Sequence, residues 1–378
     1  MEFRFTPEEE AFRAEVRAFI RAELPKVAEG ESFTKKLAER GWLTMSWPKE
    51  YGGQGAQHMR QLVYNEEMAY HRAPGQTMGA DRVGPTIILF GTEEQKERFL
   101  PRIVRDEITW CQGFSEPGSG SDLASLQTRA TRDGDSWVIN GQKIWTSNAQ
   151  RADYIILLCR TDPDAPKHRG ITYFLVDMKS PGITVRPLMQ MNGQAGFNEV
   201  FFDDVRVPAD AVVGEVNRGW YVSTATLDFE RSGIGRVIGA LRNYEEVLEY
   251  ARATPARDGS GTLFDMPQLR SALADIAVSY AVGRLMSYRV AWMQSQGLVP
   301  NYEASMAKTF GTELSQRMAR VSVTALGLAG QVLSGPGTVL RGHVPQFLLS
   351  SVSLTIAAGT SEVNRNIIAT RGLGLPRG

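Results

Sequence analysis

The spacing of apolar residues changes twice along the chain and divides the sequence into three parts. From residue 1 to 105, apolar residues recur every three or four positions, which is the period of a helix with one buried face. From 106 to 217 they form short strand-like runs separated by polar connections, and from 218 to 378 the helical period returns. This order predicts an α+β protein with an N-terminal helical domain, a central β domain and a C-terminal helical bundle, rather than a sheet wound from βαβ units.

Two sequence signatures predict where helices of the first part begin. Thr6 is followed by Pro7 and, three residues on, by Glu9, which is the arrangement of a capping box. Thr92 stands before a second amphipathic segment in the same way, and the turn-forming residues of PKEYGGQG, 48–55, predict a break between helices. The first helix is expected to bury Phe12, Val16, Phe19 and Ile20.

The central part contains a candidate hairpin turn. Asn140 and Gly141 separate two strand-like runs, WVIN and QKIW. An Asn-Gly pair between two such runs is the strongest short-range hairpin signal. We therefore predict a tight turn at this pair.

Composition and charge exclude several classes of function. The 378 residues include 42 basic and 42 acidic side chains and no basic tract, which argues against a nucleic acid or an anionic membrane surface as partner. The N-terminus lacks the apolar segment of a signal peptide and no apolar run is long enough to span a bilayer, so we expect a soluble cytoplasmic protein. Cys111 and Cys159 form no CxxC pair and suit a reducing compartment, and the four scattered histidines predict no metal site.

Residues 110–122, WCQGFSEPGSGSD, predict a strand that leads into a tight loop. Gly118 and Gly120 let the backbone fold closely, and Ser119 and Ser121 offer hydroxyl groups. Loops of this kind can hold a phosphate or pyrophosphate group through their backbone N–H groups. A lone Gly/Ser loop can also be a plain connection, and the segment is not the GxGxxG of a Rossmann fold.

The segment NGQKIWTSNA, 140–149, places an aromatic residue next to several polar ones. Trp145 is followed by Thr146, Ser147 and Asn148, so a flat apolar face would lie beside hydrogen-bonding groups. This combination suits a planar polar ring. The alternative is that Trp145 is simply a core aromatic residue.

The segment LTIAAGTSEVNRNI, 354–367, predicts the start of a helix. Gly359 can adopt positive φ, Thr360 or Ser361 can cap the helix, and Glu362 lies in the first turn. Free backbone N–H groups at such an end attract anions and polarised carbonyl groups. An ordinary capped surface helix is the alternative interpretation.

Taken together, three of these segments resemble the signatures of acyl-CoA dehydrogenases. FSEPGSGSD, KIWTSNA and GTSEVNRNI occur in the order found in that flavoprotein family, and the α, β, α pattern covers the whole chain. The resemblance implies an N-terminal α-helical domain at 1–105, a β-barrel-like domain at 106–217 and a four-helix bundle at 218–378. It also implies FAD as cofactor, an acyl-CoA substrate, an electron-transfer flavoprotein as partner, and a homotetramer or a heterotetramer with a related chain.

The resemblance assigns roles to individual residues of the flavin site. It implies that Gln112, Phe114 and Ser115 approach the isoalloxazine ring, that Trp145 covers one face of the ring and that Ser147 bonds near N5. Ser121 would bond the FAD pyrophosphate and also face the substrate. A further set would line the FAD from the C-terminal bundle, the first two of them reaching the cofactor of a neighbouring subunit: Gln331, Gly335, Thr360 and Glu362.

The residue that removes the α-proton of the thioester needs a separate argument. Many members of the family carry a Glu just before Gly-Thr, but this chain has Ala358 there, whose backbone N–H would still bond the thioester oxygen. A second arrangement, similar to the isovaleryl and long-chain branches, takes the base from the first long helix of the bundle, where Glu230 stands in TLDFERSGIGR. The neighbours Asp228 and Arg231 would contact the CoA chain or hold the helix in place.

The amphipathic pattern around Glu230 supports this choice independently. On one continuous helix, Glu230 falls inside an apolar stripe, and a carboxylate there is costly unless it is paired or functional. Desolvation would raise its pKa toward that of a useful general base. A structural ion pair with an Arg from another helix is the alternative. The stripe is formed by Leu227, Ile234, Val237, Leu241 and Leu248.

One further departure from the family pattern leaves a question open. In the loop ATPARDGSGTLFD, Gly261 and Asp265 replace an Arg and a Gly, so an Arg that contacts the neighbouring subunit's FAD is missing. This loop and Ala358 suggest a non-catalytic or co-dependent subunit of a heteromeric complex as an alternative. A flavin oxidase or monooxygenase on the same fold is a third alternative. Small residues beside the reacting carbons, including Ala358, suggest a branched or bulky acyl group.

Asp81 and Arg82 would either read a polar acyl tail or be two exposed charges.

Overall fold

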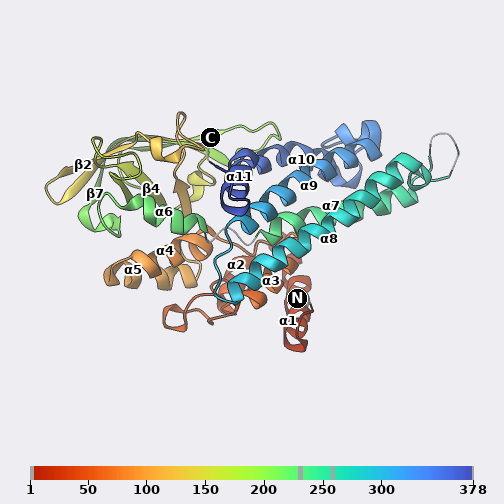
Figure 1. Ribbon diagram of the computed structural model, residues 1–378, viewed down its shortest axis with the longest axis horizontal. Helices are drawn as coiled ribbons and strands as arrows, with labels where there is room; N and C mark the ends of the chain where they lie inside the picture. The colour runs from red at the N-terminus through yellow and green to blue at the C-terminus, as the bar shows by residue number, and fades with distance from the viewer. Residues whose placement is uncertain (1–3, 229–232, 257–258, 260, 377–378) are drawn as a thin grey trace. The chain divides into compact units, whose positions relative to one another are not determined.

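The computed structural model describes the chain except for residues 1–3, 229–232, 257–258, 260 and 377–378. The chain forms two compact units, each built from separate stretches of sequence (Figure 1). One unit comprises 1–31, 57–75 and 231–378, and the other comprises 32–56 and 76–230. The helices at both ends of the sequence and the sheet between them confirm the α+β prediction. The division into three domains at 105 and 217 stays a prediction.

The sheet belongs to the second unit, and its strands follow one another in the order β6-β7-β3-β2-β4-β5-β8, with β1 added in parallel to β4. All the other adjacent pairs are antiparallel except β2 with β4, which share one parallel bridge. Strands β4 and β5 are almost entirely buried, because both contribute apolar residues to the core of this unit. The strands are β1 (Trp110–Gly113), β2 (Arg129–Asp133), β3 (Ser136–Lys143), β4 (Tyr154–Arg160), β5 (Ile171–Asp177), β6 (Ile183–Leu188), β7 (Phe197–Pro208) and β8 (Val212–Val213).

The hairpin turn lies at a different place from the one predicted. Strand β3 runs without interruption through Asn140 and Gly141, and the turn between β2 and β3 is made at Gly134, with φ of 59°. The Asn-Gly pair instead occupies an irregularity in the pairing of β3 with β7. There the Asn140 side chain accepts a hydrogen bond from the backbone N–H of Asp204 and donates one to its carboxylate. The prediction was wrong because positive φ at Gly141 serves a bulge as well as a turn.

The helices of the second unit come before, between and after its strands in sequence. Thr92 caps α5 (Glu93–Val104) with both bonds of a capping box, as predicted. The segment 48–55 forms a short 3-10 turn, η2 (Lys49–Tyr51), which also agrees with the prediction. The other helices are α2 (Phe33–Glu39), the π-helix η3 (Gly79–Val83), α4 (Gly84–Phe90), η4 (Leu123–Ser125), η5 (Ala149–Arg151), η6 (Ala209–Ala211) and α6 (Gly219–Asp228).

The first unit is helical, and α7, α8 and α9 run side by side with α10 next to α9 (Figure 1). Its core is formed by apolar faces of these helices, including Val237, Leu273 and Met318. Its helices are α1 (Pro7–Glu23), η1 (Leu24–Glu29), α3 (His58–Tyr70), α7 (Ile234–Ala253), η7 (Leu263–Asp265), α8 (Pro267–Ser295), α9 (Tyr302–Leu326), η8 (Gly327–Gln331), η9 (Leu340–Gly342), α10 (His343–Ser351), η10 (Val352–Thr355), α11 (Ser361–Ile367) and η11 (Ile368–Gly372).

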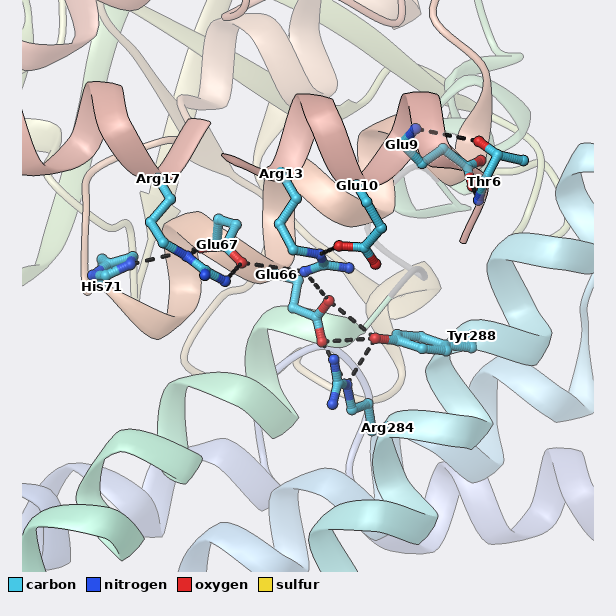
Figure 2. Close-up of polar contacts among 10 residues, drawn as sticks. All are labelled: Thr6, Glu9, Glu10, Arg13, Arg17, Glu66, Glu67, His71, Arg284 and Tyr288. Atoms are coloured by element: carbon cyan, nitrogen blue, oxygen red, sulfur yellow. Dashed lines mark hydrogen bonds and ion pairs between the residues drawn. The ribbon is translucent and has the colours of Figure 1, made fainter. Parts of the chain in front are cut away.

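Helix α1 begins as the sequence predicts and is fixed by buried charges. Thr6 and Glu9 form the capping box, and the four predicted apolar residues are buried. Figure 2 shows the carboxylate of Glu66 on α3 accepting hydrogen bonds from Arg13 on α1 and from Arg284 and Tyr288 on α8. Each of these bonds is 2.6–2.8 Å long, so Glu66 connects α3 to α1 and to α8.

The predicted helix does not continue without a break from Leu227 to Leu248. Gly233, directly before α7, has φ of 66°, which is not helical, and the described part of α6 is Gly219–Asp228. Within α7 the predicted stripe does face the interior, because Ile234 and Val237 are buried. Glu230 and Arg231 lie outside the described residues, so the position of the predicted base relative to this stripe stays a prediction.

Candidate functional site

The Gly/Ser loop follows β1 and folds back on itself. Glu116 and Ser119 exchange backbone hydrogen bonds of 2.8 and 3.0 Å, and the Ser119 hydroxyl donates to the carbonyl of Asp122. Phe114 is buried, Ser115 is half-buried, and Ser121 is exposed. Nothing lies within 4 Å of a side-chain position at Gly120, so the tip of the loop is open. The loop therefore presents Ser121 at its surface on a fixed backbone.

A buried ion pair underlies this loop. The ammonium group of Lys143, at the end of β3, is fully buried and donates to Glu116 Oε1 at 2.7 Å and to the carbonyl of Phe114 at 3.1 Å. Burial lowers the pKa of Lys143. Burial alone would raise the pKa of Glu116, but Lys143, the Thr128 side chain and the backbone N–H of Gln127 outweigh it and hold that pKa below its ordinary value.

The tryptophan predicted to cover a ring is exposed, so it is not a core residue. Trp145 follows β3 with φ of 59°, and 58% of its surface is accessible. The neighbouring Ile144 donates its backbone N–H to the carbonyl of Ser115 at 2.9 Å, which joins this segment to the Gly/Ser loop. Ser147 is exposed, and the buried hydroxyl of Thr146 has no partner among the described residues. An exposed indole beside hydroxyl groups fits a planar polar ring such as isoalloxazine.

Gln112 is the remaining predicted site residue on this unit. It is half-buried on β1, and its Oε1 accepts a hydrogen bond of 3.1 Å from Arg82 Nη1 on the π-helix η3. Asp81 and Arg82 are both half-buried, so they are not the two exposed charges that one interpretation expected. Burial raises the pKa of Asp81 to about 7, although the neighbouring Arg82 acts in the opposite direction.

The first unit carries the segment with Ala358 and the helix start. Ala358 and Gly359 both have positive φ, 54° and 80°, and Thr360 caps α11 by accepting a bond from the N–H of Val363. The carbonyl of Gly359 is held by Lys308 Nζ at 2.6 Å and by Asn364 Nδ2 at 2.9 Å. An Ala in the left-handed region is strained, and such residues cluster at functional sites. That Lys308 fixes this turn was not predicted from the sequence, because Lys308 is distant in the chain.

Other predicted residues of the first unit are exposed. The N–H of Glu362 and the hydroxyl of Thr360 lower the pKa of the Glu362 carboxylate, which is fully exposed. Gln331 ends η8, and Gly335 has φ of 88° in an exposed loop with nothing within 4 Å of a side-chain position. Both are thus accessible to another molecule.

The predicted residues form two groups, one on each unit. The sheet unit carries Gln112, Phe114, Ser115, Ser121, Trp145 and Ser147, and the helical unit carries Gln331, Gly335, Ala358, Thr360 and Glu362. Asp228 is the last residue of α6, but its side chain is not among those described, and Glu230 and Arg231 lie outside the described residues. Over the described ranges, no helix is long and apolar enough to cross a membrane, and no three His, Cys, Asp or Glu residues gather where a metal could bind.

Comparison with known families covers nearly the whole sequence. Residues 6–107 match the N-terminal domain of acyl-CoA dehydrogenases, 111–205 the middle domain and 217–373 the C-terminal domain. The chain belongs to the acyl-CoA dehydrogenase family. It is accordingly an oxidoreductase that acts on CH–CH bonds, in a family of flavoproteins that use FAD.

Individual relatives are similar over their full lengths. The acyl-CoA dehydrogenase FadE26 of Mycobacterium tuberculosis (strain ATCC 25618 / H37Rv) is 39% identical, with 100% of this chain and 99% of the relative covered. Two solved structures cover 100% of both chains: the Tcur3481-Tcur3483 steroid ACAD, with a TM-score of 0.90 and 36% identity, and the ChsE4-ChsE5 complex from Mycobacterium tuberculosis, with a TM-score of 0.89 and 38% identity.

Proposed function

We propose that this acyl-CoA dehydrogenase binds FAD and converts an acyl-CoA thioester into the 2,3-enoyl-CoA. The observation that carries the proposal is the joined pair of segments on the sheet unit, where Ser115 is bonded to the backbone beside the exposed Trp145. These segments would hold the isoalloxazine ring, and Ser121 on the open loop would bind the pyrophosphate. Bound FAD would supply the acceptor for the hydride of the β-carbon.

Glu230 is the proposed base for the α-proton. The family position of a catalytic Glu before Gly-Thr is occupied by Ala358, which has no ionisable group. By its resemblance to a second branch of the family, Glu230 in TLDFERSGIGR would stand at the position of the base. Among the hydrogen bonds of the described residues, none uses the Ala358 N–H, so this group is available to bond the thioester oxygen and stabilise negative charge that develops there.

The proposed substrate is a CoA thioester with a bulky acyl group, such as a steroid side chain. Ala357 and Ala358 are small and exposed, which leaves space beside the reacting carbons. One similar solved structure is the Tcur3481-Tcur3483 steroid ACAD. We further propose that a cytoplasmic electron-transfer flavoprotein takes the electrons, and that Asp228 and Arg231 contact the CoA chain.

The test is anaerobic reduction of the FAD-loaded protein by acyl-CoA, followed as loss of flavin absorbance. A panel of straight, branched and steroid-derived thioesters should show fastest bleaching with a bulky acyl group. Glu230→Gln should slow bleaching by several orders of magnitude, whereas the matched control Glu249→Gln, at an exposed position on α7, should bleach like the wild type. Equal rates for Glu230→Gln and the wild type would refute the assignment of the base.

A second candidate is a co-dependent subunit of a heteromeric dehydrogenase. It is favoured by the exposed loop at Gln331 and Gly335, by Gly261 in place of an Arg, and by two similar structures whose titles name two different chains. The chain expressed alone should then bind little FAD and gain both FAD and turnover when expressed with a related chain. A yellow, active protein obtained from this chain alone excludes this candidate.

A further inference from the structure

The π-helix η3, Gly79–Val83, is fixed on several sides within the sheet unit. The indole N–H of Trp47 donates to the carbonyl of Ala80 at 2.9 Å, and Thr86 Oγ1 donates to the carbonyl of Arg82 at 2.8 Å. Gly84 lies so close to Trp47 that a Cβ there would come within 2.0 Å of the ring. π-Helical turns are rare and are frequent at functional sites. The backbone that carries Arg82 is therefore held in one position.

Arg82 determines how the side chain of Gln112 is turned. Its Nη1 lies 3.1 Å from Gln112 Oε1, and the same group lies 3.9 Å from the sulfur of Met78. A guanidinium group has only donors, so the atom of the carboxamide that faces it has to be the oxygen. The NH2 group of Gln112 is consequently directed away from Arg82.

Gln112 stands close in sequence to the proposed flavin contacts. It lies on β1, where it pairs with Ile156 of the buried strand β4, and Phe114 and Ser115 follow at the end of the strand. Its half-buried side chain is the polar exception in a strand whose other residues are buried. A carboxamide in this position can donate to an acceptor of a ring that Ser115 also contacts.

Arg82 carries a positive charge next to Asp81 on η3. Burial raises the pKa of Asp81 to about 7, so this carboxyl group is partly protonated near neutral pH. A guanidinium charge within several ångströms of a redox group favours the more negative state of that group. Reduced flavin carries more negative charge than oxidised flavin, so a flavin bound beside Gln112 would be easier to reduce in the presence of Arg82, whose Nη1 lies 3.1 Å from Gln112 Oε1.

We propose that Arg82 is a positioning residue of the flavin site, which turns the Gln112 carboxamide so that its NH2 group donates to the isoalloxazine ring, and whose charge favours the reduced state of FAD. This inference rests on the proposed function, because it requires that FAD binds beside Gln112. It differs from the alternative in which Arg82 reads a polar acyl tail, which stays a prediction.

The experiment compares the reduction potential of bound FAD in the purified holoenzyme and its variants. Arg82→Met should weaken the preference for reduced over oxidised FAD by about tenfold, or about 30 mV for a two-electron couple. Arg82→Lys keeps the charge but loses the planar donor group. The reduction potential of its bound FAD should therefore stay close to that of the wild type, while its affinity for FAD should be lower. Arg98→Met, which removes an exposed arginine of α5 in the same unit, is the matched control and should not differ from the wild type.

The outcomes separate this inference from the proposed function. A wild-type chain that takes up no FAD, alone or with a related chain, overturns both. If Arg82→Met binds FAD and the reduction potential of that FAD equals the wild-type value, the inference is overturned and the proposed function is not. This holds even if the variant prefers a different acyl-CoA. If Arg82→Met does not bind FAD, the FAD affinities of Arg82→Lys and Gln112→Leu are measured instead. Affinities equal to that of the wild type in both variants overturn the inference.

Discussion

Replacing Glu116 with Gln should destabilise the sheet unit and the loop predicted to bind FAD. The carboxylate accepts three hydrogen bonds, from Lys143 Nζ at 2.7 Å, from the N–H of Thr128 at 2.8 Å and from the N–H of Gln127 at 2.6 Å. A carboxamide has one oxygen, so at least one of these donors would face an NH2 group. The Lys143 ammonium would also lose its counter-charge while it remains fully buried.

The expected decrease in the free energy of unfolding follows from the lost hydrogen bond and the lost counter-charge. An unsatisfied buried N–H costs about 1–3 kcal/mol, and removing one partner of a buried ion pair costs about 3–5 kcal/mol in total. For a unit of this size, about 2–4 °C of melting temperature is lost per kcal/mol, so we expect a decrease of about 6–20 °C. Because the pair is buried, added salt should change this difference little.

The assay is thermal unfolding of the wild type and the variants, without FAD and with excess FAD. Glu107→Gln removes a carboxylate from an exposed pair with Arg105 in the same unit and should leave the melting temperature unchanged. The double variant Glu116→Gln/Lys143→Met should recover about 1–2 kcal/mol relative to the sum of the single changes, because no buried charge remains. A melting temperature of Glu116→Gln within about 2 °C of the wild type would refute this account of the pair.

Three further predictions concern other buried or half-buried groups. Glu66→Gln should cost the helical unit about 3 kcal/mol in thermal unfolding, because it leaves Arg13 and Arg284 without their shared carboxylate, whereas Glu8→Gln on the exposed face of α1 should not. Burial raises the pKa of Cys111 and of Cys159 to about 12, so neither thiol should react with a thiol reagent at pH 8 until the protein unfolds. Folded Asp81 keeps its proton up to about pH 7, so stability should fall as pH rises from about 4 to 7; Asp81→Asn should flatten this dependence in melting curves, and an unchanged curve contradicts it.

The sequence was informative where local chemistry decides the structure. Thr6 and Thr92 cap their helices because a capping box needs only residues within one turn, and Thr360 caps α11 for the same reason. The Asn140-Gly141 pair misled because positive φ at Gly141 is compatible with both a turn and a bulge. Only the pairing of β3 with β7, more than sixty residues later in the chain, selects between them.

The supporting residues of the candidate site could not be predicted, because their partners are distant in sequence. Arg82 meets Gln112 thirty residues later, and Lys308 meets the carbonyl of Gly359 fifty-one residues later. A weak signal existed for Lys143, whose charge stands at an inward position of the alternating strand β3. A buried lysine needs a nearby acceptor, and the motif FSEPGSGSD contains Glu116. Charged residues at inward positions of strands thus identify the supports of a site, while the motifs identify the residues that they hold.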